Sequence, residues 1–335
     1  MDINHNNIAY EFGGTGIGDR LTDITVLYIL CKYLNYKVHI YFNQIINNNV
    51  AWSNNSYFDL RLFDFPENNN IIVKNNYEDK PDYYNKYIKL PYSASTGCPY
   101  NVYKFLKQFI PNLTFEEIIS EWGNYAKEII KPSQIILDKI PDNIENAYGI
   151  HLRKTDKLSN EPFNNHTDYR HESMTDEFSL IINNLIKDIT DIILKEDEPS
   201  FLIVSEDNDW KDYITNIFKE YAQKNNKTIN IININYENPD NINNYNAVLD
   251  LFCLSKCKKI FQGAKISNYS NIAAIIGNNN LINYSHLLKL NNILYTHIYR
   301  PVININGKLE YDIDLIQKIL LNIPFIDSNI TGVYQ

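Results

Sequence analysis

The second half of the chain alternates short apolar runs with segments of helical spacing, and this alternation constrains the fold more than any other feature. Five apolar runs are typical of buried strands: residues 146–152, 200–205, 228–234, 258–263 and 280–284. Between them, apolar residues recur at helical intervals in residues 177–194, 210–222 and 246–255. Such alternation predicts an α/β fold with a mostly parallel sheet and helices on both faces.

The first half begins in the same way. An apolar run at residues 8–12 leads into a glycine-rich turn, a helix is expected from about 19 to 34, and a second strand at 37–42. The signal weakens over 44–100, and helices are expected again near 102–109 and 115–130. Residues 131–143, with Pro132 and Pro141, predict the crossing between two Rossmann-like domains that face each other across a cleft.

We therefore place domain boundaries at 1–140 and 141–300, and leave 301–335 as a C-terminal segment for which a return to the first domain is one option. In such sheets ligands bind at the carboxyl ends of the strands.

Composition excludes several classes of partner. With 335 residues, 44% of them hydrophobic, the chain can build two cores, and a net charge of -9 argues against nucleic acid or an anionic membrane as partner. A small anionic ligand needs only a local positive site. No apolar run approaches 18 residues and the first residues do not resemble a signal peptide, which predicts a cytoplasmic protein. The excess of Asn, Ile, Lys and Tyr suggests an AT-rich genome such as that of a large DNA virus or of some protists.

The four cysteines are too few and too scattered for a disulfide framework. Cys253 and Cys257 lie one helical turn apart, but no second Cys or His pair follows to complete a zinc site. Buried thiols are the expected state, and no metal is predicted.

The stretch AYGIHLRKTDK places a His and an Arg where an apolar strand ends. Because side chains alternate along a strand, Gly149, His151 and Arg153 share one face, and the core-like residues share the other. An Arg at that edge can present a planar fork of donors to a phosphate. The alternative is an Arg in an interdomain salt bridge and a hydrogen-bonded core His, and spacing alone favours neither.

The segment GGTGIGDRL puts Gly13, Gly14, Gly16 and Gly18 between a strand and a helix. It matches neither the G-x-G-x-x-G dinucleotide motif nor the P-loop, which needs Gly-Lys-Ser/Thr. Glycines still let a backbone approach a ligand closely, and a helix N-terminus offers N–H groups to an anion. A tight strand-to-helix turn is the alternative, and the number of glycines exceeds what that turn needs.

Polar residues at three further points are candidates for ligand contacts. Asp207 follows the strand at 200–205, where it either faces a ligand or caps the next helix. Asp250 stands among apolar residues in a helical segment, either on its solvated side or aimed at a pair of donors. Ser267 and Ser270 open the last helix, where they can receive a phosphate or cap the helix.

This ordered set resembles the GDP-fucose-dependent fucosyltransferases, the superfamily of α1,6-fucosyltransferases, the rhizobial nodulation fucosyltransferase and protein O-fucosyltransferases. The first motif of that family, His-x-Arg-Arg-Thr-Asp-Lys with a downstream Glu, is matched by His151, Arg153, Thr155, Asp156, Lys157 and Glu161. LIVSED resembles the second motif, and the segment from Asp250 to the Ser267 turn resembles the third. The likeness covers about 148–277 and, before that, only the glycine turn and its helix.

The resemblance implies a GT-B-like, metal-independent, inverting glycosyltransferase that moves fucose from GDP-fucose to a glycan hydroxyl. Arg153 would then neutralise the departing diphosphate, Asp250 would accept the donor pair of guanine, and His151 would lie against the nucleotide. Glu161, or less favourably Asp156, is the candidate base. The first domain would then bind the acceptor. Its candidates for stacking against a sugar, with core packing as the favoured alternative in a chain of 26 tyrosines, are Trp52, Tyr83, Tyr84, Tyr87 and Tyr92. The chain departs from the α1,6 enzymes at Lys154, which replaces a second Arg and offers a point charge instead of a fork.

Other readings stay open. GDP-mannose or an activated deoxysugar is an alternative donor, since no feature of the sequence identifies the sugar itself. A catalytically silent nucleotide-sugar or glycan-binding protein of the same fold is a second hypothesis. An NAD-dependent oxidoreductase is disfavoured by the failed glycine spacing.

Overall fold

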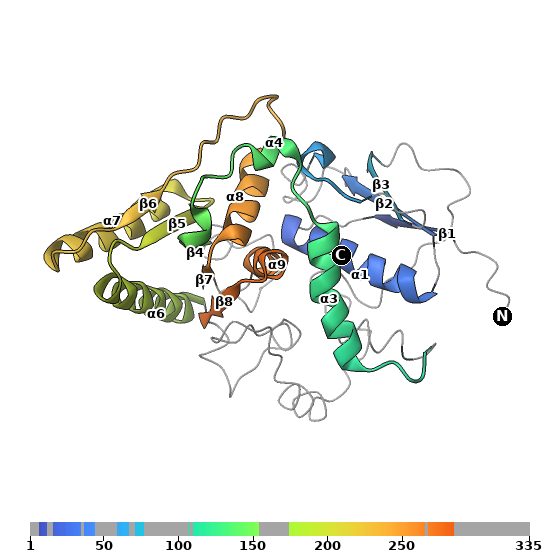
Figure 1. Cartoon of the computed structure of the whole chain (residues 1–335), viewed down its shortest axis with the longest axis horizontal. Helices are drawn as coiled ribbons and strands as arrows, with labels where there is room; N and C mark the ends of the chain where they lie inside the picture. Colours follow the sequence, from blue (N-terminus) through green and yellow to red (C-terminus); the bar gives the residue numbers. More distant parts are fainter. Residues whose placement is uncertain are drawn as a thin grey trace, which may run out of the picture.

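Two parallel β-sheets, one in each half of the chain, form the computed structural model (Figure 1). The structure describes residues 7–11, 16–34, 37–43, 59–66, 71–76, 107, 110–153, 174–264 and 267–284. The predicted α/β class with parallel sheets is therefore confirmed. The helix expected at 102–109 lies outside the described residues, apart from Lys107.

The first sheet has the order β1-β2-β3, with every pair parallel. Its elements are β1 (Asn7–Glu11), α1 (Ile17–Leu34), β2 (Lys37–Asn43) and β3 (Ile71–Asn76). The predicted strand-helix-strand unit is confirmed, with α1 beginning two residues before the expected start. The third strand was missed, because its apolar run Ile71–Val73 is short and ends in Lys-Asn-Asn.

Among the described residues between β3 and β4, the chain forms the helix α3 (Phe115–Ile129), the short helix α4 (Gln134–Leu137) and the short turn η4 (Ile144–Asn146). A further short turn, η1 (Leu60–Leu62), lies earlier, between β2 and β3. A capping box starts α3: the Thr114 hydroxyl accepts from the Glu117 N–H, and the Glu117 carboxylate accepts from the Thr114 N–H at 2.8 Å. The segment before α4 is tied to the first half by a bridge between Phe63 and Pro132.

The second sheet has five parallel strands in the order β6-β5-β4-β7-β8. The strands are β4 (Tyr148–Leu152), β5 (Ser200–Ser205), β6 (Asn230–Ile232), β7 (Lys259–Gly263) and β8 (Asn280–Asn283). The helices are α6 (Met174–Lys195), α7 (Asn208–Lys224), α8 (Tyr245–Lys256) and α9 (Asn268–Gly277). Each predicted strand and helix of this half is present.

Different helices cover the two faces of this sheet. Tyr148, Ile150 and Leu152 pack in one cluster with buried residues of α6 and α7. The opposite face is covered by α8 and α9, which is why β4 has a glycine there: a Cβ at Gly149 would lie 2.8 Å from Leu254 Cδ2. The alternation predicted for β4 is therefore observed.

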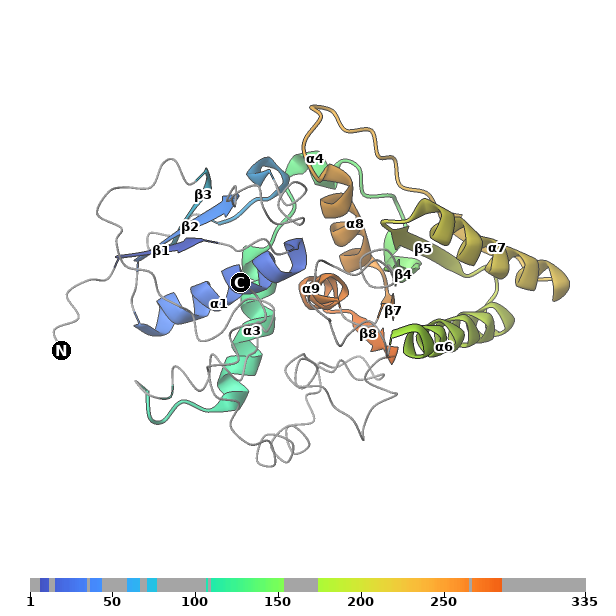
Figure 2. The ribbon, with the colours of Figure 1, turned by 180° about the vertical axis from the view of Figure 1, so that it is seen from behind.

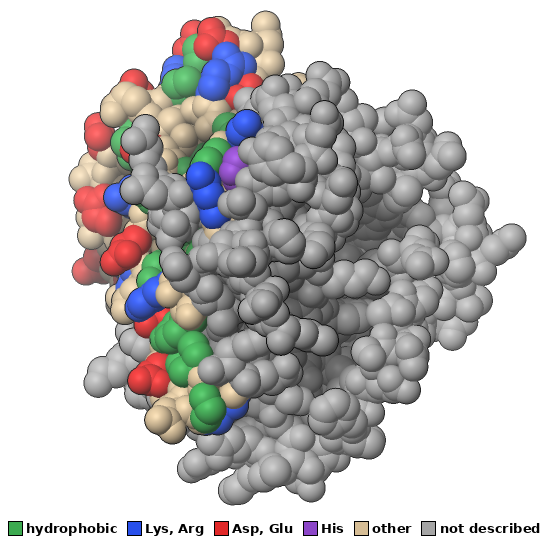
Figure 3. All heavy atoms as spheres, turned by 90° about the vertical axis from the view of Figure 1, so that its right-hand side faces the viewer, with side chains coloured by type: hydrophobic (Ala, Val, Ile, Leu, Met, Phe, Trp, Pro, Cys, Tyr) green, Lys and Arg blue, Asp and Glu red, His purple; other side chains and the backbone are tan. Residues whose placement is uncertain are grey.

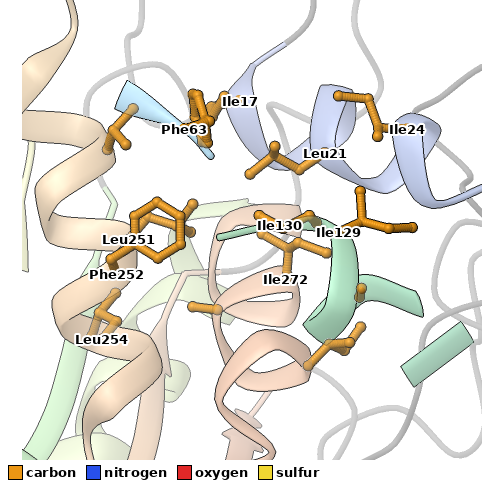
Figure 4. Close-up of a cluster of buried hydrophobic side chains, with 14 of the residues drawn as sticks. Ile17, Leu21, Ile24, Phe63, Ile129, Ile130, Leu251, Phe252, Leu254 and Ile272 are labelled. Atoms are coloured by element: carbon orange, nitrogen blue, oxygen red, sulfur yellow. The ribbon is translucent and has the colours of Figure 1, made fainter. Parts of the chain in front are cut away.

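A shared hydrophobic core joins the two halves of the chain. Figure 4 shows Leu21 of α1 and Ile130, which follows α3, close to Ile272 of α9. Each of these side chains is at most 1% exposed. Burying an Ile or Leu side chain contributes about 1.5–3 kcal/mol, so this contact sets how the two sheets lie relative to each other.

Both ribbon views place α8 and α9 between the two sheets, with α6 and α7 on the far side of the second sheet (Figures 1 and 2). On the face seen in Figure 3, described side chains of both charges are interspersed. Among the helices of the described ranges, none combines the length and apolar character that crossing a membrane requires.

Candidate functional site

The strand order of the second sheet reverses beside β4. The chain passes from β4 to β5 and β6 on one side, and then returns to β7 and β8 on the other. In open parallel sheets, ligands bind outside the carboxyl ends of the strands at such a reversal. Arg153 follows β4 directly at this point, and its backbone N–H lies 3.4 Å from the Gly263 carbonyl oxygen at the end of β7.

His151 lies on the α9 side of β4 and is 7% exposed. Its Nδ1 is 2.6 Å from the Ser270 hydroxyl in the first turn of α9, and its ring centroid is 4.9 Å from that of Tyr269. Of the two alternatives for this His, the hydrogen-bonded core position is thus realised in the structure. Because a hydroxyl can donate or accept, the direction of this hydrogen bond depends on the tautomer of the imidazole ring.

Arg153 is partly exposed at the reversal. Its Nε lies 4.0 Å from a carboxylate oxygen of Glu206, which follows β5. The two side chains are 26% and 43% exposed, and a pair of this exposure contributes little to stability. The contact with Glu206 is therefore a weak one.

Two of the predicted polar residues act as helix caps. The Asp207 carboxylate accepts from the Trp210 N–H at 2.9 Å and caps α7. The Ser267 hydroxyl accepts from the Tyr269 N–H at 3.2 Å and caps α9. The capping alternative is observed for both residues, and both stay close to the reversal because they follow β5 and β7.

Asp250 is partly buried on α8. Its Oδ1 accepts a hydrogen bond of 2.7 Å from the hydroxyl of Tyr236, which precedes the helix. Burial raises the pKa of Asp250 to about 6, although the Tyr236 hydrogen bond and the charge of Lys211 act in the opposite direction. Asp250 thus accepts a hydrogen bond from a specific donor, which is one of the two alternatives that the sequence left open. Its carboxyl group is ionised only in part near pH 6.

Sequence reasoning missed two tyrosines of this site. Tyr236 contacts Asp250, and Tyr269 stacks near His151 while its hydroxyl donates to the Ala247 carbonyl of α8. The alternation of Ile232, Ile234 and Tyr236 with two asparagines was the available signal that the Tyr236 side chain points inward. No signal separated Tyr269 from the other tyrosines of the chain.

Gly16 and Gly18 are the described members of the glycine-rich turn. Gly16 is exposed directly before α1, where a Cβ would meet nothing within 4 Å, and Gly18 is buried in the first turn. The other predicted glycines, Gly13 and Gly14, lie outside the described residues. So do most residues of the first motif, including Lys154, Asp156 and Glu161, and the aromatic residues Trp52, Tyr83, Tyr84, Tyr87 and Tyr92.

Within the described ranges, no three His, Cys, Asp or Glu side chains come together as a metal site. Among the described residues, Cys31, Cys253 and Cys257 are buried free thiols, as expected for Cys253 in α8 and for Cys257 directly after it. The predicted absence of a metal from the reaction stays a prediction.

Comparisons with known proteins complete the description. No protein-family model and no curated protein sequence matches the chain. Among solved structures, the chain is similar to the fucosyltransferase NodZ from Bradyrhizobium, at 10% identity and a TM-score of 0.47, over 84% of this chain and 97% of that one. It is also similar to NodZ α-1,6-fucosyltransferase soaked with GDP-fucose, at 10% identity and a TM-score of 0.45, over 82% of this chain and 93% of that one.

A third similar structure is a mutant of Arabidopsis thaliana FUT1 in complex with GDP, at 11% identity and a TM-score of 0.44, over 84% of this chain and 70% of that one. At these identities and TM-scores the likeness carries no inference about chemistry, which must come from the residues of the chain itself. The comparisons give no support to a viral source.

Proposed function

We propose that the chain is a glycosyltransferase that transfers fucose from GDP-fucose to a glycan hydroxyl. The observation that supports this most is the position of the His-x-Arg motif. His151 and Arg153 lie at the strand-order reversal, the edge where parallel sheets bind ligands, next to the first turn of α9. The order of motifs along the chain is that of the GDP-fucose-dependent family it resembles.

Arg153 would meet the charge that develops during transfer. When the sugar-phosphate bond breaks with inversion, positive charge grows on the sugar carbon and negative charge on the diphosphate. A preorganised donor at a developing anion contributes ~3–4 kcal/mol to the rate. The guanidinium can supply this donor on exchanging its partly exposed Glu206 neighbour for the diphosphate. The N-terminus of α9 adds backbone N–H groups from the same side.

Asp250 would bind the base of the donor. Guanine presents N1–H and the N2 amine as adjacent donors, and one carboxylate can accept both. The Tyr236 hydroxyl uses one of the two lone pairs on Oδ1, so acceptor positions remain on both oxygens. Protonation of Asp250 removes one of those acceptors, so binding of the base is expected to weaken as the pH falls through about 6.

The acceptor hydroxyl needs a base, for which the motif offers Glu161 and, less favourably, Asp156. The inverting course, the absence of a metal and the glycan acceptor are further parts of this proposal. Another nucleotide sugar, such as GDP-mannose or an activated deoxysugar, would bind to the same protein groups, because none of the described contacts distinguishes one sugar from another.

A catalytically silent binding protein is the second candidate. The observations that favour it are Lys154 in place of the second Arg of the motif and the approach of Glu206 to Arg153. Incubation with GDP-fucose and a glycan array separates the two candidates. Transfer that is lost in Glu161→Gln, while GDP binding is kept, supports the enzyme; binding without any transfer supports the silent protein.

Calorimetry with GDP in the presence of EDTA tests the proposal directly. We expect binding by the wild type and a loss of about 100-fold or more in Arg153→Ala, from the loss of a donor worth ~3 kcal/mol. The matched control is Arg61→Ala, which removes an Arg whose guanidinium lies 2.8 Å from Asp59. No binding by the wild type, or equal affinity in the two variants, would contradict the proposal.

A further inference from the structure

Tyr236 belongs to an extended segment between β6 and α8. Side chains alternate along this segment as they do in a strand: Ile232, Ile234 and Tyr236 pack against the hydrophobic core, and Asn233, Asn235 and Glu237 are exposed. The position of the Tyr236 ring therefore follows from the backbone that leaves β6.

The far end of the segment is fixed by Asn238. Its side-chain amide donates to the Ile242 carbonyl at 2.8 Å, and its carbonyl oxygen accepts from the Ile242 N–H at 2.8 Å. Both polar groups of the Asn side chain are thus used to close a tight turn before α8. With β6 at one end and this turn at the other, the segment has little freedom to move Tyr236 away from the helix.

The Tyr236 hydroxyl donates a hydrogen bond of 2.7 Å to Asp250 Oδ1. The other ionisable groups that act on this pair come from each element packed around it: Lys211 from α7, Cys253 from α8 itself and Tyr269 from α9, with Glu206 acting in turn on Tyr269. The Lys211 ammonium lies 5.9 Å from the centroid of the Tyr236 ring. Among these groups, only the Tyr236 hydroxyl has a hydrogen bond to Asp250 in the described part of the structure.

We propose that Tyr236 is a positioning residue, which holds the Asp250 carboxylate charged and in one orientation so that it can accept the base of the donor nucleotide. This inference rests on the proposed function. Tyr236 contacts the carboxylate and is not itself assigned to the ligand.

Two physical effects follow from the hydrogen bond. A donor on Oδ1 fixes the rotation of the carboxylate, so that its remaining lone pairs keep a constant direction. A hydrogen bond to the charged form also favours that form, against burial, which disfavours it. Without the hydroxyl, Asp250 is expected to hold its proton to a higher pH, and the carboxylate is charged in a smaller fraction of molecules near neutrality.

The test is Tyr236→Phe, which removes one oxygen atom, with Tyr284→Phe as its matched control. The Tyr284 hydroxyl also donates to an aspartate, Asp188 of α6 at 2.8 Å, but from the other face of the sheet. GDP affinity is measured from pH 5.5 to 9 for wild type and both variants, with UDP as the nucleotide that keeps the diphosphate and changes the base. Ratios of variant to wild type at each pH cancel the ionisation of GDP itself.

We expect the pH at which GDP affinity falls to move up by about one to two pH units in Tyr236→Phe, the effect of losing one hydrogen bond to a charged group. At pH 7 this corresponds to an affinity loss of about two- to tenfold, shrinking toward pH 9 as the carboxylate ionises in the variant too. Tyr284→Phe should keep the wild-type profile. A Tyr236→Phe profile that superimposes on that of Tyr284→Phe overturns the proposal.

NMR titration of the Asp250 side-chain carboxyl, in wild type and both variants, separates this inference from the proposed function. If the wild type does not bind GDP at any pH, the proposed function fails, and so does the role given to Tyr236 in binding. An upward shift of the Asp250 titration in Tyr236→Phe would then show only the ion-stabilising contact. If Tyr236→Phe does not fold, a wild-type GDP affinity, taken relative to UDP, that does not fall between pH 7 and pH 5.5 overturns the proposal, because the charge of Asp250 then has no part in binding the base.

Discussion

Replacing Asp250 by Asn should make the protein more stable and at the same time remove its binding of GDP. The carboxylate has an ordinary pKa of 3.8, and burial raises it to about 6 in the folded protein. Between these values the folded state holds the proton more tightly than the unfolded state. Stability therefore falls as the pH rises from about 4 to 6, and the full cost is present above pH 6.

The size of that cost follows from the shift. Two pKa units correspond to ~3 kcal/mol, and a side chain with some exposure to solvent retains about 2 kcal/mol of it. Asn resembles the protonated carboxyl, because its amide oxygen can still accept from Tyr236. We therefore expect Asp250→Asn to unfold about 3 °C higher than wild type at pH 8, and the difference to vanish below pH 4.

Thermal unfolding at pH 3.5, 6 and 8 measures the stability change, and calorimetry with GDP at pH 7.5 measures binding. The amide presents an N–H₂ group where guanine needs an acceptor, so binding should fall by at least tenfold. A variant that is less stable than wild type at pH 8, or a difference in unfolding temperature that does not change with pH, would show that burial does not penalise the charge of Asp250.

Three further variants test the packing of the chain. Gly277→Ala should destabilise the chain by about 3 kcal/mol, since its Cβ would lie 1.8 Å from the Ser255 carbonyl oxygen. Its control is Gly16→Ala, where a Cβ meets nothing within 4 Å and the cost should be less than about 1 kcal/mol. Equal unfolding midpoints of the two variants would refute this prediction. Ser270→Ala should lower the stability by about 1–3 kcal/mol, because it leaves buried His151 Nδ1 without its hydroxyl partner. It should also change the tautomer of the His151 ring, which ¹⁵N NMR measures. An unchanged tautomer and an unchanged stability would contradict the role of Ser270 as that partner.

The fold of the second half could be predicted because its strands are buried on both faces. Runs such as Phe201–Val204 are apolar throughout, and each of these residues is at most 1% exposed. The first half was harder to predict, since β3 offers only three apolar residues before Lys74 and two asparagines. Strand signals of that length are not distinguishable from a loop in an Asn-rich sequence.

The site could be predicted only where its residues follow strands. The positions of His151 and Arg153 follow from alternation along β4 and from the rule that parallel sheets bind ligands at their carboxyl ends. The partners of those residues could not be predicted. Ser270 lies 119 positions from His151, and pairing across such a distance depends on strand order, which the sequence does not give.

Strand order also explains why the candidate residues meet although they are distant in sequence. Because β7 pairs with β4 on the side opposite β5, the segment after β7 returns α9 to the end of β4 and brings Tyr269 and Ser270 to His151. The Tyr269 hydroxyl then donates to Ala247 of α8, the helix that contains Asp250. Asp250, the proposed contact for the base, and His151, two residues before the proposed diphosphate contact Arg153, are thereby linked through α9. Substitutions that move α9 should consequently weaken both contacts together, whereas Tyr236→Phe should weaken only the contact with the base.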